Sequence, residues 1–257
     1  MNSHPGHEQY PAMNCCLLIP HYNHERQFIA FLPQLVATGL PLIVVDDGSH
    51  ESSRTQVASA LAQYQNTYFF TLQRNRGKGG AVKAGAVFAR NLGFTHALQI
   101  DADGQHNVAD IAEFLRRAQQ YPESIICGKP VFDASAPKAR VYGRKVTDFW
   151  VALETLSLRI KDGLCGFRVY PLTQIENVFD HYFVGNRMDF DTELLVKAVW
   201  LNTPLIFIDT KVIYPEQSVS HFNYLRDNLL LIKLHSRLML GMLLRLPLLL
   251  WQRLRGK

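Results

Sequence analysis

The chain has 257 residues and few of the features that mark exported, membrane-spanning or zinc-binding proteins. It has only four cysteines, at positions 15, 16, 127 and 165, and none of their spacings resembles a zinc site. We therefore expect reduced, mostly buried thiols, as in a cytosolic protein. The polar residues 1–13 lack the apolar stretch of a signal peptide and are expected to form a loose tail. No uninterrupted apolar run reaches the ~20 residues needed to span a bilayer.

The chain has no net positive charge outside its C-terminal segment. The formal net charge is +5, but residues 226–257 hold seven Lys and Arg against one Asp, a local charge of +6, so the rest sums to −1. This distribution argues against general nucleic-acid binding. It predicts a near-neutral body over residues 14–225 and a basic C-terminal element with a partner of its own. The body has no internal repeat and no linker long enough to divide it.

Short apolar runs alternate with amphipathic runs along the first half of the chain. The apolar runs predict strands at residues 15–19, 42–45, 68–72, 97–100 and 124–127. The amphipathic runs predict helices at residues 25–38, 53–64, 78–92 and 107–120. Because the strands carry almost no polar position, we expect an α/β fold with a mostly parallel sheet flanked by helices. The second half predicts helices at residues 142–159 and 190–200 and strands at residues 205–208 and 211–214.

Polar clusters follow three of these strands, at residues 20–23, 46–49 and 101–103. Ligands of parallel α/β sheets bind beyond the carboxyl ends of the strands, so we expect the three clusters to form one site. Asp101 and Asp103 stand one residue apart, and Gly104 lets the backbone turn away behind them. Two converging carboxylates suit a hard divalent cation whose remaining ligands are phosphate oxygens. The site therefore indicates a nucleotide or diphosphate substrate.

The C-terminal segment 226–257 is Leu-rich and basic. On a helix, Arg226, Lys233, Arg237 and Arg245 fall within about a third of the circumference. A wide apolar face with a narrow basic stripe predicts amphipathic helices lying in a membrane interface. Pro247 is expected to break or kink the segment. The alternative is a pair of helices that pack on the body or on a second subunit.

Four segments, taken together, resemble the family 2 glycosyltransferases: residues 19–23, 44–49, 75–81 and 101–106. Within that family they look most like the dolichyl- or polyprenyl-phosphate sugar synthases. The resemblance implies a GT-A fold, a nucleotide-sugar donor, a Mg²⁺ or Mn²⁺ ion and inversion at the anomeric carbon. The Gly-rich segment 75–81 is not a P-loop, because the P-loop spacing is absent.

The same resemblance implies roles for individual residues. The donor would be bound by Pro20, Tyr22, Asn23, Asp46, Asp47, Lys78, Asp101 and Ala102. The metal would be held by Asp101, Asp103 and Gln105. Neutralising the departing diphosphate is the chemistry that such an ion supplies.

The acceptor side of the site is left open between two chemistries. The segment around Asp189 and Asp191 resembles the acidic segment of the family near the acceptor. If the acceptor is a hydroxyl, one of these two carboxylates acts as general base, and the sequence does not choose between them. If the acceptor is a lipid phosphate, it needs no base, and arginines matter more because they pair bidentately with phosphate. The candidate arginines are Arg140, Arg144, Arg168 and Arg226.

We therefore expect an inverting, metal-dependent glycosyltransferase that moves a hexose from a nucleotide-sugar to a lipid or polyprenyl-phosphate acceptor, peripheral on the cytoplasmic face of the cell membrane. Two other classes remain open. A nucleotidyltransferase that makes sugar nucleotides shares the layout, but it needs a Gly-rich basic loop after the first strand, which residues 20–23 do not provide. A non-catalytic membrane-associated module would bind nucleotide without turnover. The sequence names neither the base, the sugar, the acceptor nor the oligomeric state.

Overall fold

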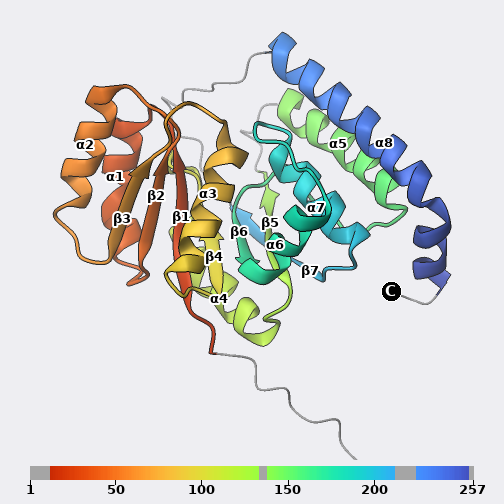
Figure 1. Cartoon of the computed structure of the whole chain (residues 1–257), viewed down its shortest axis with the longest axis horizontal. Helices are drawn as coiled ribbons and strands as arrows, with labels where there is room; N and C mark the ends of the chain where they lie inside the picture. Colours follow the sequence, from red (N-terminus) through yellow and green to blue (C-terminus); the bar gives the residue numbers. More distant parts are fainter. Residues whose placement is uncertain (1–11, 133–137, 212–223, 255–257) are drawn as a thin grey trace, which may run out of the picture.

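The computed structural model describes residues 12–132, 138–211 and 224–254 of the chain. Within these ranges one seven-stranded sheet has the order β3-β2-β1-β4-β6-β5-β7 (Figure 1). Its strands are β1 (Cys15–His21), β2 (Leu42–Asp46), β3 (Thr67–Thr71), β4 (His96–Gln99), β5 (Ile125–Val131), β6 (Arg168–Pro171) and β7 (Leu205–Lys211). The helices are α1 (Glu25–Val36), α2 (Glu51–Leu61), α3 (Lys78–Asn91), the 3-10 turn η1 (Val108–Asp110), α4 (Ile111–Gln120), α5 (Lys138–Thr155), α6 (Leu172–His181), α7 (Phe190–Trp200) and α8 (Tyr224–Leu254).

The sheet is mostly parallel, as the sequence predicts. All pairings are parallel except those of β6, which runs antiparallel to both β4 and β5. Neither β6 nor α6 is predicted from the sequence, because β6 is short and places the charged Arg168 in a buried position. The two strands expected at residues 205–208 and 211–214 are one strand, β7, as far as Lys211, and residues 212–214 lie outside the described part.

Two apolar cores cover the two faces of the sheet. Along β1, Leu18 belongs to the core under α3, α6, α7 and α8, whereas Leu17 and Ile19 belong to the core under α1, α2 and α4. Alternate residues of a strand point to opposite faces, so a strand buried on both sides is apolar over most of its length. The four cysteines are free thiols buried in these cores, as expected.

The register of the central strands brings the polar clusters together. His21 at the end of β1 pairs with Asp46 at the end of β2, and Leu18 pairs with Gln99 at the end of β4. Residues 20–23, 46–49 and 101–103 therefore follow three adjacent strands at the same edge of the sheet. This edge is the one at which α/β sheets bind ligands.

Two glycines inside helices give opposite predictions for stability. A Cβ at Gly85 in α3 would collide with Leu18 and lie 2.9 Å from Val45 Cγ2, whereas a Cβ at Gly143 in α5 would meet nothing within 4 Å. We expect Gly85→Ala to lower the free energy of unfolding by about 1–3 kcal/mol through overpacking. Gly143→Ala should raise it by up to about 1 kcal/mol through helix propensity. Denaturant unfolding of both variants checks this, and an equal effect would contradict the close packing of α3 on β1.

The C-terminal segment is a single helix where the sequence predicts more than one. α8 contains 31 residues and continues past Pro247, so the helix does not break there, and the alternative of a kink stays a prediction. A proline removes one backbone donor, and the buried side chains of Met242 and Leu249 hold the helix to the body on both sides of it. α8 packs on α5 and α7, and Figure 1 shows α5 and α8 side by side. Among the described helices, none combines the length and apolar character that crossing a bilayer requires.

Candidate active site

The first two polar clusters are joined by Asp46, which lies fully buried at the end of β2. One of its carboxylate oxygens is 3.2 Å from His21 Nδ1, and the other accepts the Ser49 N–H at 3.1 Å. Burial raises the pKa of Asp46, but the bonds from His21 and Ser49 outweigh burial and leave that pKa below its ordinary value. Both carboxylate oxygens of Asp46, which is predicted to bind the donor, thus make contacts within the protein that fix the shape of the turn after β2.

Asp47 connects this turn to the Gly-rich segment. Its two oxygens accept the N–H groups of Arg76 and Gly77, each at 2.7 Å. Gly48, at φ +74°, has no room for a side chain, because a Cβ would lie 2.7 Å from the Asn75 nitrogen. Asp47 therefore holds the segment before α3 against the ends of β1 and β2.

The first cluster completes this wall. Asn23 donates its N–H to Ser49 Oγ at 2.9 Å and accepts the His50 N–H at the same distance. Pro20 pairs with Val45 in the sheet and is half-buried, whereas the Tyr22 side chain is exposed. Among these residues, Tyr22 is the one whose ring is open to a ligand from the side of β1.

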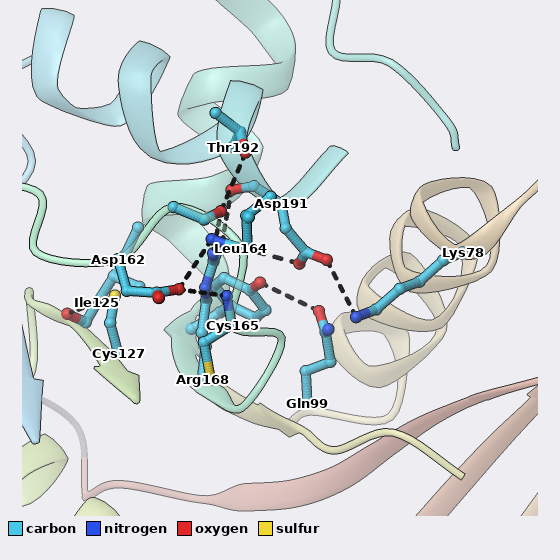
Figure 2. A network of polar contacts seen from close by, with 12 residues as sticks. Lys78, Gln99, Ile125, Cys127, Asp162, Leu164, Cys165, Arg168, Asp191 and Thr192 are labelled. Atoms are coloured by element: carbon cyan, nitrogen blue, oxygen red, sulfur yellow. Dashed lines mark hydrogen bonds and ion pairs between the residues drawn. The ribbon is translucent and has the colours of Figure 1, made fainter. Parts of the chain in front are cut away.

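Lys78, the first residue of α3, reaches across the site. Its Nζ lies 2.9 Å from Asp101 Oδ1 and 3.0 Å from Asp191 Oδ2. Figure 2 shows the lysine extending from α3 toward Asp191. Burial would lower the pKa of Lys78, but the two carboxylates outweigh it and raise that pKa, so the ammonium stays charged. A Cβ at Gly166 would collide with this ammonium, so the lysine depends on a glycine there.

Asp101 and Asp103 form the acidic turn after β4. Burial alone would raise the pKa of Asp101, but the charges of Lys78 and His106 hold it below its ordinary value. Burial and the nearby Asp101 charge raise the pKa of Asp103. The backbone N–H of Gln105 donates to Asp103 Oδ1 at 3.0 Å, so Gln105 shapes the turn through its main chain. Its predicted role as a side-chain metal ligand stays a prediction.

The acidic turn fits a hard divalent cation. Asp101 Oδ1 is buried and accepts no hydrogen bond, although it lies in the ion pair with Lys78. Across the described residues no cluster of three or more His, Cys, Asp or Glu side chains forms a complete metal cage. Mg²⁺ is typically bound by one or two carboxylates, with phosphate oxygens and water as the other ligands. The turn thus has the composition of a metal site that is completed by a diphosphate.

Arg168, predicted to contact an acceptor phosphate, is instead enclosed in the protein. Its side chain has no exposed surface. The guanidinium donates to the carbonyl of Asp191 at 2.8 Å and to that of Gly163 at 3.0 Å (Figure 2). Its Nη1 lies 3.8 Å from Asp191 Oδ1, an oxygen that accepts no hydrogen bond. Arg168 therefore positions the Asp191 backbone, and the Asp191 side chain is linked to the acidic turn through Lys78.

Arg144 also differs from the simple phosphate ligand expected. Arg144 is paired with Asp162 at 2.5 Å, and Asp162 in turn accepts the N–H groups of Leu164 and Cys165. Arg144 thus braces the loop before β6. The side chains of Arg140 and Arg226 lie outside the described part of the chain.

The structure separates the two acidic candidates that the sequence leaves equal. Asp189 accepts the Arg187 N–H at 3.0 Å and lies 3.8 Å from Arg237 of α8. It faces the loop before α7, whereas Asp191 faces Lys78. Sequence reasoning missed Gln99, whose Oε1 accepts the Tyr170 hydroxyl at 3.0 Å and whose Nε2 is buried without a partner. A polar residue inside the otherwise apolar run 97–100 was the available signal.

Comparisons with known proteins point to one family of transferases. The family model described as "Glycosyl transferase family 2" matches residues 16–179. A dolichyl-phosphate beta-glucosyltransferase of Dictyostelium discoideum is 30% identical over 174 residues, which cover 64% of this chain and 52% of that protein. The Homo sapiens dolichyl-phosphate beta-glucosyltransferase is 26% identical, covering 76% of this chain and 66% of that protein. The chain thus spans about half to two thirds of the length of these relatives.

A solved structure shares the fold at low identity. Glucosyl-3-phosphoglycerate synthase of Mycobacterium tuberculosis, in complex with Mn²⁺, UDP-glucose and phosphoglyceric acid, matches with a TM-score of 0.63 and 12% identity. The match covers 91% of this chain and 79% of that one. The GT-A fold implied by the sequence resemblance is confirmed. On its family match and its fold, the chain belongs to glycosyl transferase family 2.

Proposed function

We propose that this protein transfers a hexose from a nucleotide-sugar to a polyprenyl phosphate at a membrane surface, with inversion and with Mg²⁺ or Mn²⁺ held by Asp101 and Asp103. The observation that carries the proposal is the Lys78 ammonium between Asp101 and Asp191 at the ligand-binding edge of the sheet. Relatives named as dolichyl-phosphate beta-glucosyltransferases support the acceptor class. The Mn²⁺ and UDP-glucose in the Mycobacterium tuberculosis enzyme support the donor and the metal.

The residues divide the work as follows. When bound, the metal neutralises negative charge on the departing diphosphate. Lys78 adds a fixed positive charge beside the acidic turn, where burial strengthens its effect. Asp47 keeps the backbone of Arg76 and Gly77 in place along the donor. A phosphate acceptor is already an anion, so Asp191 need not act as a base and instead orients Lys78.

We also propose that α5 and α8 present an apolar surface to the membrane. Large apolar side chains on both helices are exposed, among them Tyr142, Val146 and Phe149 on α5 and Leu240, Leu244 and Leu254 on α8. The basic residues that the sequence assigns to a stripe partly fold back instead. Arg237 donates to Glu193 at 2.6 Å, and Arg245 donates to the Tyr182 hydroxyl at 3.1 Å. Apolar contact, more than charge, therefore supports docking, and we place it on the cytoplasmic face.

The transfer assay combines the protein, MnCl₂ or MgCl₂, a panel of UDP- and GDP-hexoses and a short prenyl phosphate such as farnesyl phosphate. We expect one nucleotide-hexose to give a prenyl phosphohexose, detected by mass spectrometry. The proposal is overturned if no sugar nucleotide in the panel is bound or consumed. Release of pyrophosphate from a nucleoside triphosphate would instead identify a nucleotidyltransferase.

The membrane surface is tested by vesicle flotation. Leu240 and Leu244 are 60% and 76% exposed, so Leu240→Glu with Leu244→Glu should leave the fold intact. We expect this double variant to lose most of its binding to phosphatidylethanolamine and phosphatidylglycerol vesicles, because charged groups resist transfer into the interface. Leu92→Glu is the matched control, since Leu92 is 40% exposed at the C-terminal end of α3. If wild type does not float, or if it is a dimer that the double variant dissociates, the surface is not a membrane contact.

A further inference from the structure

A cavity of about 240 Å³ lies between the loop before α7 and the helix α8. Three cationic side chains line it, Arg187 from the loop and Lys233 and Arg237 from α8. Asp189 is the carboxylate among its lining residues. The cations therefore exceed the carboxylate by two, and the site described above does not use the cavity.

The nearby acidic groups do not cancel this excess. Asp189, which lies 3.8 Å from Arg237, is already subtracted in this excess of two. Glu193, the partner of Arg237, also accepts the Gly185 N–H at 2.6 Å and pairs with Lys197. Because Lys197 offsets the charge of Glu193, the cavity keeps its positive character. A small anion is the ligand that such a cavity favours.

Besides Gly185 and Asn186, the rest of the cavity lining is apolar. It comes from Phe183 in the loop and from Leu230 and Leu234 on α8. Phe183 is 71% exposed, and Leu229 beside Leu230 is 65% exposed, so the apolar wall continues onto the outer surface of α8. The cavity thus joins a cationic part to an apolar surface. A ligand with an anionic group and an apolar chain would be complementary to both parts.

The cavity also lies beside the donor segment. Arg187 Nη1 lies 3.4 Å from Asn75 Oδ1, at the start of the Gly-rich segment. A Cβ at Gly77 would lie 2.8 Å from Arg187 Cγ, so the two segments pack against each other there. Asp189, on the cavity wall, is two residues before Asp191. A molecule in the cavity therefore approaches the reacting site from the α8 side.

We infer that this cavity binds the phosphate headgroup of the acceptor, with the first prenyl units against Phe183, Leu230 and Leu234. Arg187 supplies a planar fork that matches phosphate oxygens, and Lys233 supplies a point charge. Arg237 positions the cavity wall through Glu193. The inference deepens the proposed function and rests on it, since it names where the acceptor of that same reaction binds.

The test measures binding of three probes to the full chain by isothermal titration calorimetry: farnesyl phosphate, inorganic phosphate and farnesol. We expect farnesyl phosphate to bind at least about tenfold more tightly than either of the others, because only it uses both walls. Lys233→Gln should weaken farnesyl phosphate binding about tenfold, as expected for loss of one charge-assisted contact. Binding of the nucleotide-sugar identified in the transfer assay should not change.

Arg116→Gln is the control, since Arg116 is an exposed arginine on α4, which packs against β5 and β6. Equal binding of farnesyl phosphate to wild type and Lys233→Gln would overturn the inference while leaving the proposed function intact. Inorganic phosphate that binds as tightly as farnesyl phosphate would overturn the apolar part of the site. Failure of the proposed function is a separate result, namely no hexose transfer by wild type to any prenyl phosphate.

Discussion

Replacing Asp101 with Asn is expected to lower the rate of hexose transfer by about 10²–10³-fold, the cost of losing one preorganised charge at a departing group. Asp101 serves both halves of the site, since it belongs to the acidic turn and pairs with Lys78 at 2.9 Å. The neutral amide would bind the metal ion more weakly than the carboxylate does. It also removes one of the two carboxylates that pair with Lys78. Steady-state kinetics at saturating MnCl₂ and donor measures the effect.

A second readout separates this loss from misfolding. Wild type should show a rise in melting temperature when Mn²⁺ and the donor are added together, and Asp101→Asn should lose most of that rise. Asp209→Asn is the matched control, because Asp209 is a carboxylate with a side chain 65% exposed at the far edge of the sheet. If Asp101→Asn transfers hexose at a rate within a few-fold of wild type, Asp101 does not hold a metal ion that the reaction needs.

Replacing Arg168 with Met is expected to lower the free energy of unfolding by about 3–5 kcal/mol, the usual cost of removing one partner from a buried charged contact. The guanidinium donates hydrogen bonds to the carbonyls of Asp191 and Gly163. The substitution removes both of these hydrogen bonds at a buried position. At roughly 2–4 °C per kcal/mol for a chain of this size, the melting temperature should fall by about 6–20 °C. Thermal and denaturant unfolding both measure it.

The control for Arg168 is Arg116→Met, which should change stability by no more than about 0.5 kcal/mol because its pair with Glu113 is exposed. The comparison also decides what Arg168 does. If Arg168→Met is as stable as wild type but loses acceptor binding, Arg168 is a phosphate ligand after all. The buried contacts predict the opposite result.

The edge of the sheet that carries the site is predictable because the positions of the strands along the chain follow from local pattern. Apolar runs bounded by Gly and polar residues mark the strands, and parallel neighbours must end at one edge. Asp46, Asp47, Asp101 and Asp103 could therefore be grouped before any contact was known. Their division of labour could not, because it depends on partners distant in the sequence, such as Arg76 for Asp47.

The acceptor side shows where pattern reasoning ends. An arginine in a loop-like segment is expected to be an exposed ligand. Arg168 instead lies in a short, buried antiparallel strand that forms only by pairing with strands distant in the sequence. Likewise, helical periodicity places Arg237 on a stripe of α8, but it does not show that Arg237 pairs with Glu193 of α7. The role of a charged side chain can be assigned only when the fold shows which charged group it contacts.

We propose that Asp101 and Asp103 hold the metal ion beside which the hexose leaves the nucleotide-sugar. The most direct measurement is the mass-spectrometric yield of prenyl phosphohexose from farnesyl phosphate and the sugar-nucleotide panel, with MnCl₂ and with excess EDTA. We expect product with one donor in MnCl₂, almost none in EDTA, and almost none with Asp101→Asn in either condition. Product formed equally well in EDTA and in MnCl₂ would show that the transfer does not depend on a metal ion.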